Sequence, residues 1–367
     1  MLRNSLKETR IFSSSERWVE ELTVVIPVFN QQENICRNLE ALVSSLTMST
    51  RIVIVDDAST DKTFDTLITF LEAFRPGDCI SIELKRNEVP KYETACDYLG
   101  FHDAKSPYLL EVQADMEIND LGFDRRLVTQ LEENPDLIAV SGRGTEPLGP
   151  IIERYRRTAG SELANGKTLF RHIINRLYFQ AMALSRGKGK NRNLPPELTP
   201  HAESEPLIFP EIESFCKTGS AGRVGLLIDS PIKAEEFGGA LWLGQTVMRG
   251  PLMIDRKKYV ELGGFDCSKF FLGFDEHELF LKAYLLKGYR VGFTPVEFVS
   301  PLEHGSTRRR RNLKQELELL KHLTRIASGR KKSYLYSANE EQIRRLPPPE
   351  IRYVSSNQAD EGGGFSN

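Results

Sequence analysis

Short apolar runs alternate with amphipathic segments in the first 141 residues of the chain. Runs rich in β-branched residues predict buried strands at Leu22–Phe29, Arg51–Val55, Ile80–Leu84, Tyr108–Val112 and Leu137–Ser141. Between them, apolar residues recur at helical spacing in Glu33–Leu46, Phe64–Leu71 and Thr94–Ala104. Because the connections are short, this alternation predicts an α/β fold with largely parallel strands and helices on both faces of the sheet.

The pattern changes after residue 149. Residues 149–243 contain a basic, helix-compatible segment (Ile151–Leu184) and then a stretch rich in Gly, Lys and Pro that predicts a surface loop. Regular elements return at Thr246–Ile254, Asp275–Leu286 and Tyr289–Phe293, and a polar-faced helix is predicted at Leu313–Ile326. We expect an extension over residues 1–20, one domain over 21–330, and a charged, flexible tail over 331–367.

Charge and cysteine content narrow the classes of protein. The formal net charge is −2, so no overall positive field favours nucleic acid as a partner. The five cysteines form no CxxC pair, which favours a reducing, cytoplasmic location. No run approaches the ~20 apolar residues of a membrane span, so we expect no transmembrane segment. Peripheral contact with a membrane stays open.

Adjacent carboxylates end the second predicted strand. Ligands of parallel sheets bind beyond the carboxyl ends of the strands, where Asp56 and Asp57 stand. Such carboxylates accept hydrogen bonds from a uracil imide or from ribose hydroxyls. Helix capping by Asp57 or Ser59, with Asp61 in the first turn, explains the same residues equally well.

A second polar cluster, Gln113, Asp115 and Glu117, follows the fourth predicted strand. Alternate residues of an extended segment share a face, so these three side chains can point to one place. Magnesium and manganese commonly use one or two protein carboxylates together with substrate phosphates. The cluster therefore indicates either a metal site on a diphosphate or a solvated strand end.

Acidic residues gather again at the start of the predicted helix at 275–286. Asp275, Glu276 and Glu278 lie within four positions together with His277, which exceeds what helix capping requires. An ionised carboxylate there is a candidate general base for a hydroxyl acceptor. His304, next to an arginine run, is either a metal ligand or an ordinary surface residue.

Four segments in this order resemble the family-two glycosyltransferases of the GT-A fold. They are VVIPVFNQQENI, RIVIVDDASTDKT, YLLEVQADMEI, and RGPLMIDRKKYVELGGFD with GFDEHEL and LLKGYRV. The resemblance runs from about residue 22 to 304. It implies a mixed, mainly parallel sheet flanked by helices, with a donor half at about 21–145, an excursion at about 149–243 and an acceptor half at about 244–305.

The resemblance also implies a nucleotide site. Pro27 and Phe29 would lie beside the nucleobase, Asp57 would bind the uracil, and Asp56 would support it. Lys91 stands roughly where the family often has a cation near the diphosphate. The donor implied is a nucleotide sugar, with UDP as the expected nucleotide.

The metal and the base follow from the same resemblance. Asp115 matches the metal-binding Asp of the DxD segment, with Gln113 in the place of its first Asp. Apart from the resemblance, His304 stays the second candidate ligand of Mn²⁺ or Mg²⁺. Glu276 aligns with the usual catalytic base, and Asp275 stands beside it.

The implied activity is a metal-dependent, hexosyltransferase-like transfer to a hydroxyl acceptor, with inversion, in the synthesis of a glycan or polysaccharide precursor. Gln113 removes one carboxylate from the family pattern and favours the alternative, a non-catalytic protein that binds nucleotide sugar or glycan. A nucleotidyltransferase would have a Gly-rich basic loop after the first strand, and PVFNQQEN contains neither Gly nor Lys.

Overall fold

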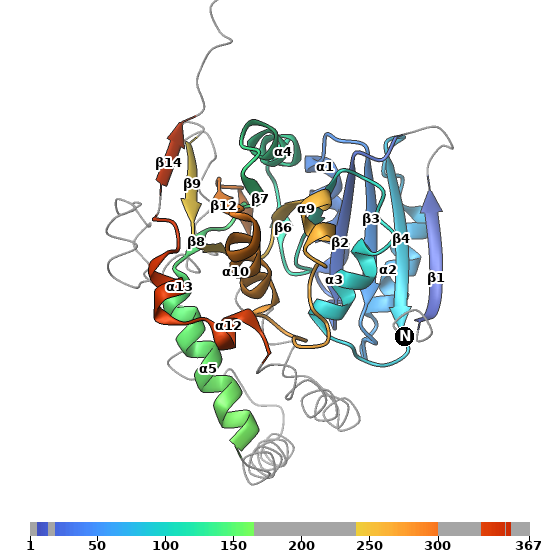
Figure 1. The fold of residues 1–367 in the computed structure, drawn as a ribbon. Helices are drawn as coiled ribbons and strands as arrows, with labels where there is room; N and C mark the ends of the chain where they lie inside the picture. Colours follow the sequence, from blue (N-terminus) through green and yellow to red (C-terminus); the bar gives the residue numbers. More distant parts are fainter. Residues whose placement is uncertain (1–5, 14–18, 165–239, 300–331, 349, 354–367) are drawn as a thin grey trace, which may run out of the picture.

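A single ten-stranded sheet forms the centre of the described part of the molecule (Figure 1). The computed structural model describes residues 6–13, 19–164, 240–299, 332–348 and 350–353. Across the sheet the strands are β1 (Leu6–Ser13), β4 (Ile80–Asn87), β3 (Thr50–Asp56), β2 (Leu22–Val28), β5 (Tyr108–Glu111), β11 (Leu252–Asp255), β7 (Leu137–Ser141), β12 (Arg290–Phe293), β9 (Ala240–Gly244) and β14 (Glu350–Tyr353).

Parallel pairing is concentrated in the first half of the chain. Strands β4, β3, β2 and β5 are parallel neighbours, and Val28 at the end of β2 pairs with Asp56 at the end of β3. Strand β11 runs antiparallel between β5 and β7, while β12 is parallel to β7. The carboxyl ends of β2, β3 and β4 therefore lie at one edge of the sheet, where the sequence predicted a ligand site.

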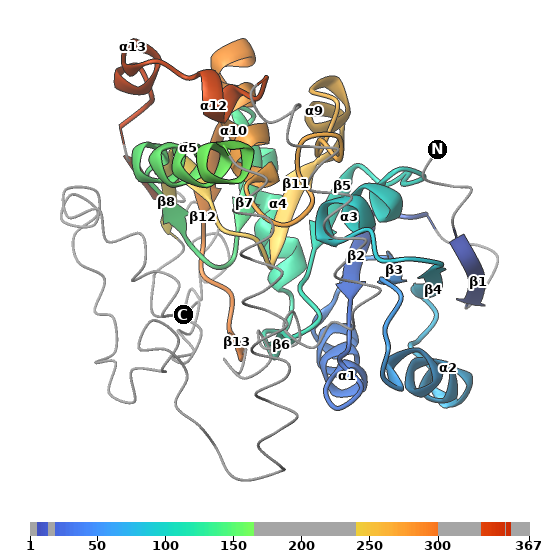
Figure 2. The same ribbon diagram turned by 90° about the horizontal axis from the view of Figure 1, so that it is seen from below.

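Helices cover both faces of the sheet (Figure 2). One face is covered by α1 (Ile35–Ser45), α2 (Thr63–Ala73) and α4 (Phe123–Glu133), whose apolar residues join one buried core. The opposite face is covered by α3 (Glu93–Phe101), α9 (Arg256–Glu261) and α10 (Asp275–Lys287), which contribute to a second core. Spacing of three or four residues places Ile35, Leu39 and Leu42 on the buried side of α1.

Two short pairs of strands form two-stranded sheets of their own beside the ten-stranded sheet. Strand β8 (Thr145–Glu146) pairs with β10 (Thr246–Val247), and β6 (Glu117–Ile118) pairs with β13 (Phe298–Val299). All the strands predicted between residues 22 and 141 are present, and the first three helices begin and end within three residues of their predicted limits.

The segment expected to be a flexible tail is folded between residues 332 and 353, so that expectation was wrong there. Helices α12 (Tyr334–Ser337) and α13 (Glu340–Arg344) pack beside α5 (Leu148–Ala164) and α10, and β14 pairs antiparallel with β9. The reason is burial that composition does not reveal: Leu335 and Leu346 join Leu148 and Leu281 in a third core. Charge and proline content masked these two apolar contacts.

The amino-terminal extension also contributes to the sheet, because β1 pairs antiparallel with β4. Helix α5 confirms a helix at the start of the excursion, while residues 165–239 and the helix expected at Leu313–Ile326 lie outside the described residues. In the described ranges, no helix combines the length and the apolar character of a membrane span.

Glu278 provides a test of how the carboxyl-terminal segment is attached. Its Oε1 and Oε2 accept hydrogen bonds from the backbone N–H groups of Tyr334 and Leu335, each at 2.8 Å. Glu278→Ala leaves these donors without their acceptor, so we expect the free energy of unfolding to fall by about 1–3 kcal/mol in urea titrations. The control is Glu340→Ala, which removes an exposed ion pair to Arg344 and is expected to cost less than about 1 kcal/mol. If Glu278→Ala and Glu340→Ala lower the free energy of unfolding equally, the hydrogen bonds of Glu278 to the start of α12 do not hold this segment.

Candidate active site

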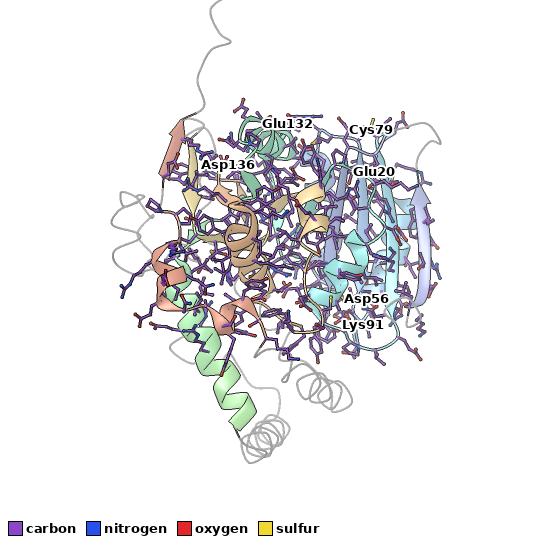
Figure 3. The ribbon with its side chains drawn as sticks, in the orientation of Figure 1. Glu20, Asp56, Cys79, Lys91, Glu132 and Asp136 are labelled. Carbon is purple, nitrogen blue, oxygen red and sulfur yellow. The ribbon has the colours of Figure 1, made fainter. Side chains whose placement is uncertain are left out.

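The predicted nucleotide residues gather at the carboxyl edge of the parallel strands. Pro27 and Phe29 are half-buried at the end of β2, and Asp56 ends the neighbouring β3. Asp56 and Lys91 lie at the same edge of the molecule, opposite Cys79 and Glu132 (Figure 3). The structure therefore brings these residues together as the sequence implied.

Asp57 organises the chain that follows β4. Its Oδ1 accepts hydrogen bonds from Asn87 Nδ2 at 2.8 Å and from the Lys91 backbone N–H at 2.7 Å. Its Oδ2 accepts one from the Tyr92 backbone N–H at 2.8 Å. These three bonds tie the Asp57 carboxylate to the segment that follows β4.

Asp56 is fully buried and faces Arg86. The Arg86 Nε lies 3.3 Å from the Asp56 Oδ2, and its guanidinium lies 4.3 Å from the centre of the Phe64 ring. Burial raises the pKa of Asp56 to about 6, against the opposing influence of Arg86. Burial lowers the pKa of Lys91, against the opposing influence of its acidic neighbours, among them Asp57.

Helix capping, the other explanation for these acids, falls to different residues. Asp61 Oδ1 accepts a hydrogen bond from the Thr63 backbone N–H at 2.9 Å, at the start of α2. Ser59 Oγ accepts one from the Asn30 backbone N–H at 2.9 Å and so ties the ends of β2 and β3 together. Asp57 therefore has no part in capping α2.

The predicted metal segment bends instead of staying extended. A turn spans residues 113–116, closed by a 3.1 Å hydrogen bond from the Met116 N–H to the Gln113 carbonyl. Because of this turn, Glu117 does not share a direction with Gln113 and Asp115, and its Oε2 lies 2.8 Å from the Nε of Arg37 on α1. The alternation expected for a strand was wrong here.

Gln113 and Asp115 have a cationic neighbour, Arg143. The Gln113 Oε1 accepts a 3.5 Å contact from Arg143 Nη1, and burial lowers the pKa of Arg143 against the opposing influence of the Asp115 carboxylate. In the described residues, no group of three or more His, Cys, Asp or Glu side chains is arranged to hold a metal ion. His304, the second predicted ligand, lies outside the described residues.

The start of α10 is joined to α3 by one buried arginine. Arg249, in the connection between β10 and β11, donates hydrogen bonds to the carboxylates of Asp97 and Asp275. Its Nε lies 3.4 Å from the Glu276 Oε2, and its Nη1 lies 3.7 Å from the Glu93 Oε1. The acids that the sequence assigned to catalysis are thus paired with a guanidinium rather than capping their helix.

This cluster holds more carboxylates than cations. Glu111 on β5 is fully buried, and among the described residues no hydrogen-bond partner reaches either of its carboxylate oxygens. Burial raises the pKa values of Glu111 and Asp97 well above their usual range and that of Asp275 to about 8. Burial and mutual repulsion both disfavour the full ionisation of these carboxyls.

His277 sits on the other side of Glu276. Its Nδ1 lies 2.8 Å from the Thr246 hydroxyl, and its Nε2 lies 3.6 Å from Glu276 and 3.7 Å from Glu146. Burial lowers the pKa of His277 to about 4, so the imidazole is neutral at pH 7. Glu276 is therefore flanked by a permanent cation, Arg249, and by a neutral ring.

The sequence did not single out Arg249, Asp97, Glu111 or Arg143. Two of them carry a weak signal, a charged residue in a buried element: Glu111 ends the strand YLLE, and Asp97 lies on the buried side of α3, whereas Arg143 and Arg249 lie in connections. A single charged residue of this kind does not identify a site in the sequence, because the site forms only when the fold brings several of them into contact.

The neutral state of His277 has a measurable consequence. Its folded pKa, about 4, lies below the unfolded value of 6.5, so the unfolded chain binds more protons between these limits. Stability is therefore lost as the pH falls through this window, by up to about 2 kcal/mol between pH 7 and pH 5. Urea titrations at pH 7 and pH 5 measure this loss. Between the two pH values, the free energy of unfolding of the wild type should fall by about 2 kcal/mol more than that of His277→Gln. Parallel losses in the two proteins would contradict the assignment.

Comparisons with known proteins agree with this architecture. Residues 23–188 match the family model described as Glycosyl transferase family 2. The undecaprenyl-phosphate 4-deoxy-4-formamido-L-arabinose transferase of Serratia proteamaculans is 32% identical over 137 residues, which cover 36% of this chain and 37% of the relative. The transferase of the same name from Photorhabdus laumondii is 28% identical over 172 residues, 46% of each chain. The chain thus spans less than half the length of these relatives.

Two solved structures are similar at low identity. A mannosyltransferase from Pyrobaculum calidifontis, in complex with GDP-Man and Mn²⁺, has a TM-score of 0.45 and 16% identity, over 89% of this chain and 73% of that one. GalNAc-T7 with UDP, GalNAc and Mn²⁺ has a TM-score of 0.44 and 14% identity, over 78% and 44%. The mixed sheet with helices on both faces is the arrangement expected from the sequence. Residues 23–188 are thus similar to glycosyltransferase family 2, and the mixed, mainly parallel sheet with helices on both faces is the arrangement of the GT-A fold.

Proposed function

We propose that this chain transfers a hexosyl group from a UDP-linked sugar to a hydroxyl of a glycan acceptor, with inversion at the anomeric carbon. One observation carries the proposal: the nucleotide-side residues at the ends of β2 and β3 share a sheet edge with the buried carboxylates at the start of α10. A nucleotide sugar bound at the first group would present its sugar toward the second. A cytoplasmic location is part of the proposal.

The donor side is supported by the residues at the strand ends. Pro27 and Phe29 are partly exposed and offer an apolar wall to a nucleobase. Asp57 lies at this edge as the residue that would bind the uracil, and Asp56 supports the β3 end through its ion pair with Arg86. Lys91 supplies a cation near the position proposed for the diphosphate.

A divalent metal, Mn²⁺ or Mg²⁺, is compatible with this site only as a partner of the bound diphosphate. Asp115 is half-buried beside the donor edge and would hold it, with Gln113 two residues before it; His304, the second candidate ligand, lies outside the described residues. The described residues supply no complete protein cage, so diphosphate and water oxygens would complete the coordination. A bound metal would stabilise negative charge on the departing diphosphate.

Glu276 is proposed as the general base. Its carboxylate takes the proton of the acceptor hydroxyl while that oxygen forms a bond to the anomeric carbon. The bond between the anomeric carbon and the diphosphate oxygen breaks, and the nucleoside diphosphate leaves with the electron pair. Asp275 is hydrogen-bonded to Arg249, which supports an orienting role for it beside Glu276.

The names of the relatives favour a second acceptor, a polyprenyl phosphate. With this acceptor the protein would make peripheral contact with a membrane. A phosphate oxyanion has no proton to remove, so it needs no general base. The acidic start of α10 is therefore explained better by a hydroxyl acceptor, and the two candidates differ in their dependence on Glu276.

The base assignment predicts a specific kinetic change. Glu276→Gln keeps the size of the side chain and removes its basicity, so kcat with a hydroxyl acceptor should fall by about 10²–10⁴-fold. Donor affinity should change little, because the residue faces the acceptor. Asp275→Asn should have a milder effect if it mainly orients the acceptor.

The outcomes separate the candidates. If the Glu276→Gln variant still transfers the sugar to a polyprenyl phosphate, the acceptor is the phosphate and not a hydroxyl. A larger loss in Asp275→Asn would move the base to Asp275. If neither variant lowers kcat by even about 10-fold, the start of α10 is not the catalytic site.

Nucleotide binding is tested separately from turnover. UDP with Mn²⁺ should raise the melting temperature of the wild type, because a ligand that binds only the folded state stabilises it. Asp115→Asn should remove the metal-dependent part of this shift, whereas Asp136→Asn, at the opposite edge of the sheet (Figure 3), should keep it. A full shift in excess EDTA would contradict the metal. A shift without turnover on any acceptor would identify a non-catalytic binding protein.

A further inference from the structure

Arg249 occupies an unusual position in the site. Its side chain is only 4% exposed, it stands outside any helix or strand, and it lies between two helices that are distant in sequence. Its Nη1 bonds to Asp97 on α3 and its Nη2 to Asp275 on α10, while the guanidinium carbon lies 4.7 Å from the centre of the Phe265 ring. The fork of the guanidinium is thus engaged by two carboxylates and held against an aromatic ring.

The two bonds fix directions as well as charge. A guanidinium is planar, and its N–H groups point along fixed lines, so two carboxylates bonded to different nitrogens are held at one mutual geometry. A lysine ammonium is a point charge on a flexible stem and imposes no such geometry. Asp275 begins α10, so this contact sets where the helix starts relative to α3.

We propose that Arg249 is a positioning residue, which holds the start of α10 against α3 through Asp97 and Asp275 and so places the Glu276 carboxylate toward the acceptor. The proposal rests on the proposed function, in which Glu276 is the base. Arg249 touches neither substrate nor reacting atoms in this role and acts through its two aspartates.

The competing explanation is that Arg249 only neutralises buried charge. Its neighbourhood is strongly acidic: Glu93 and Asp97 face it from α3, Glu111 from β5, and Asp275 and Glu276 from α10, while Glu146 and the neutral His277 lie beyond Glu276. Any cation at this place would lower the repulsion among these carboxyls. The two explanations differ in whether a cation without the fork restores activity.

Three variants separate them. Arg249→Lys keeps the charge and removes the fork. Arg249→Met removes both and leaves several carboxyls without their cation, so it can fail to fold. Arg249→Met combined with Asp97→Asn removes the cation together with one of the buried carboxyls that face it, which limits the acidic charge left without a partner and keeps the test usable. Arg51→Met is the control, because Arg51 is a partly buried, ion-paired arginine at the start of β3, away from the site.

The measurement is kcat and the donor KM against pH, together with the melting temperature. Positioning predicts that Arg249→Lys and the double variant keep a melting temperature near that of the wild type and a similar acidic limb of the pH–rate profile. Their kcat should nevertheless fall by about 10–100-fold with little change in donor KM, because small misplacements of a catalytic group are costly. Arg51→Met should keep the wild-type kcat.

Each result decides between the explanations. If Arg249→Lys or the double variant has the wild-type kcat, charge alone suffices and the positioning role is overturned. A loss of kcat that appears only as a shift of the acidic limb to higher pH also overturns it, because removing a cation disfavours the ionised carboxylate by charge alone. If Glu276→Gln keeps the wild-type kcat, the base assignment fails, and the positioning role fails with it. If Glu276→Gln loses activity and the Arg249 variants keep it, the proposed function stands and Arg249 has no role in placing Glu276.

Discussion

The burial of several carboxyl groups around a single guanidinium is the interaction on which the rest of the site depends. Arg249 contacts acids from α3 and α10, and Glu111 on β5 adjoins them with no hydrogen-bond partner for its oxygens in the part of the chain that the structure describes. Burying charge without a partner is costly, so such an arrangement persists only where the fold over-determines it. Here the two helices are anchored to the same face of the sheet by a common apolar core.

The sheet explains why the acids meet. The parallel strands β2, β3 and β4 bring their carboxyl ends to one edge, and β11 is inserted antiparallel between β5 and β7. The connection that enters β11 therefore arrives at the same edge and delivers Arg249 between α3 and α10. The carboxyl-terminal segment supports α10 from the other side, through the hydrogen bonds of Glu278 to α12.

Sequence patterns predicted most of the alternating half of the fold, because strands buried on both faces are continuous apolar runs that differ plainly from amphipathic helices. They placed Asp56, Asp57 and Asp115 correctly at one edge of the sheet, since strand ends follow from strand limits. They failed for β14 and α12, which are held by contacts with residues more than 50 positions away. They failed also for Arg249, because its role depends on carboxylates that the fold brings together from α3, α10 and β5.

The central claim is that these residues act on a nucleotide sugar. The most direct measurement is the release of nucleoside diphosphate by the wild-type protein from a panel of UDP-, GDP- and dTDP-linked sugars, with Mn²⁺ and a mixture of glycan acceptors. We expect the wild-type protein to release UDP from at least one UDP-sugar only when an acceptor is present, and to form a product of inverted anomeric configuration. No release of diphosphate from any donor, under conditions in which UDP binding is detected, would contradict it.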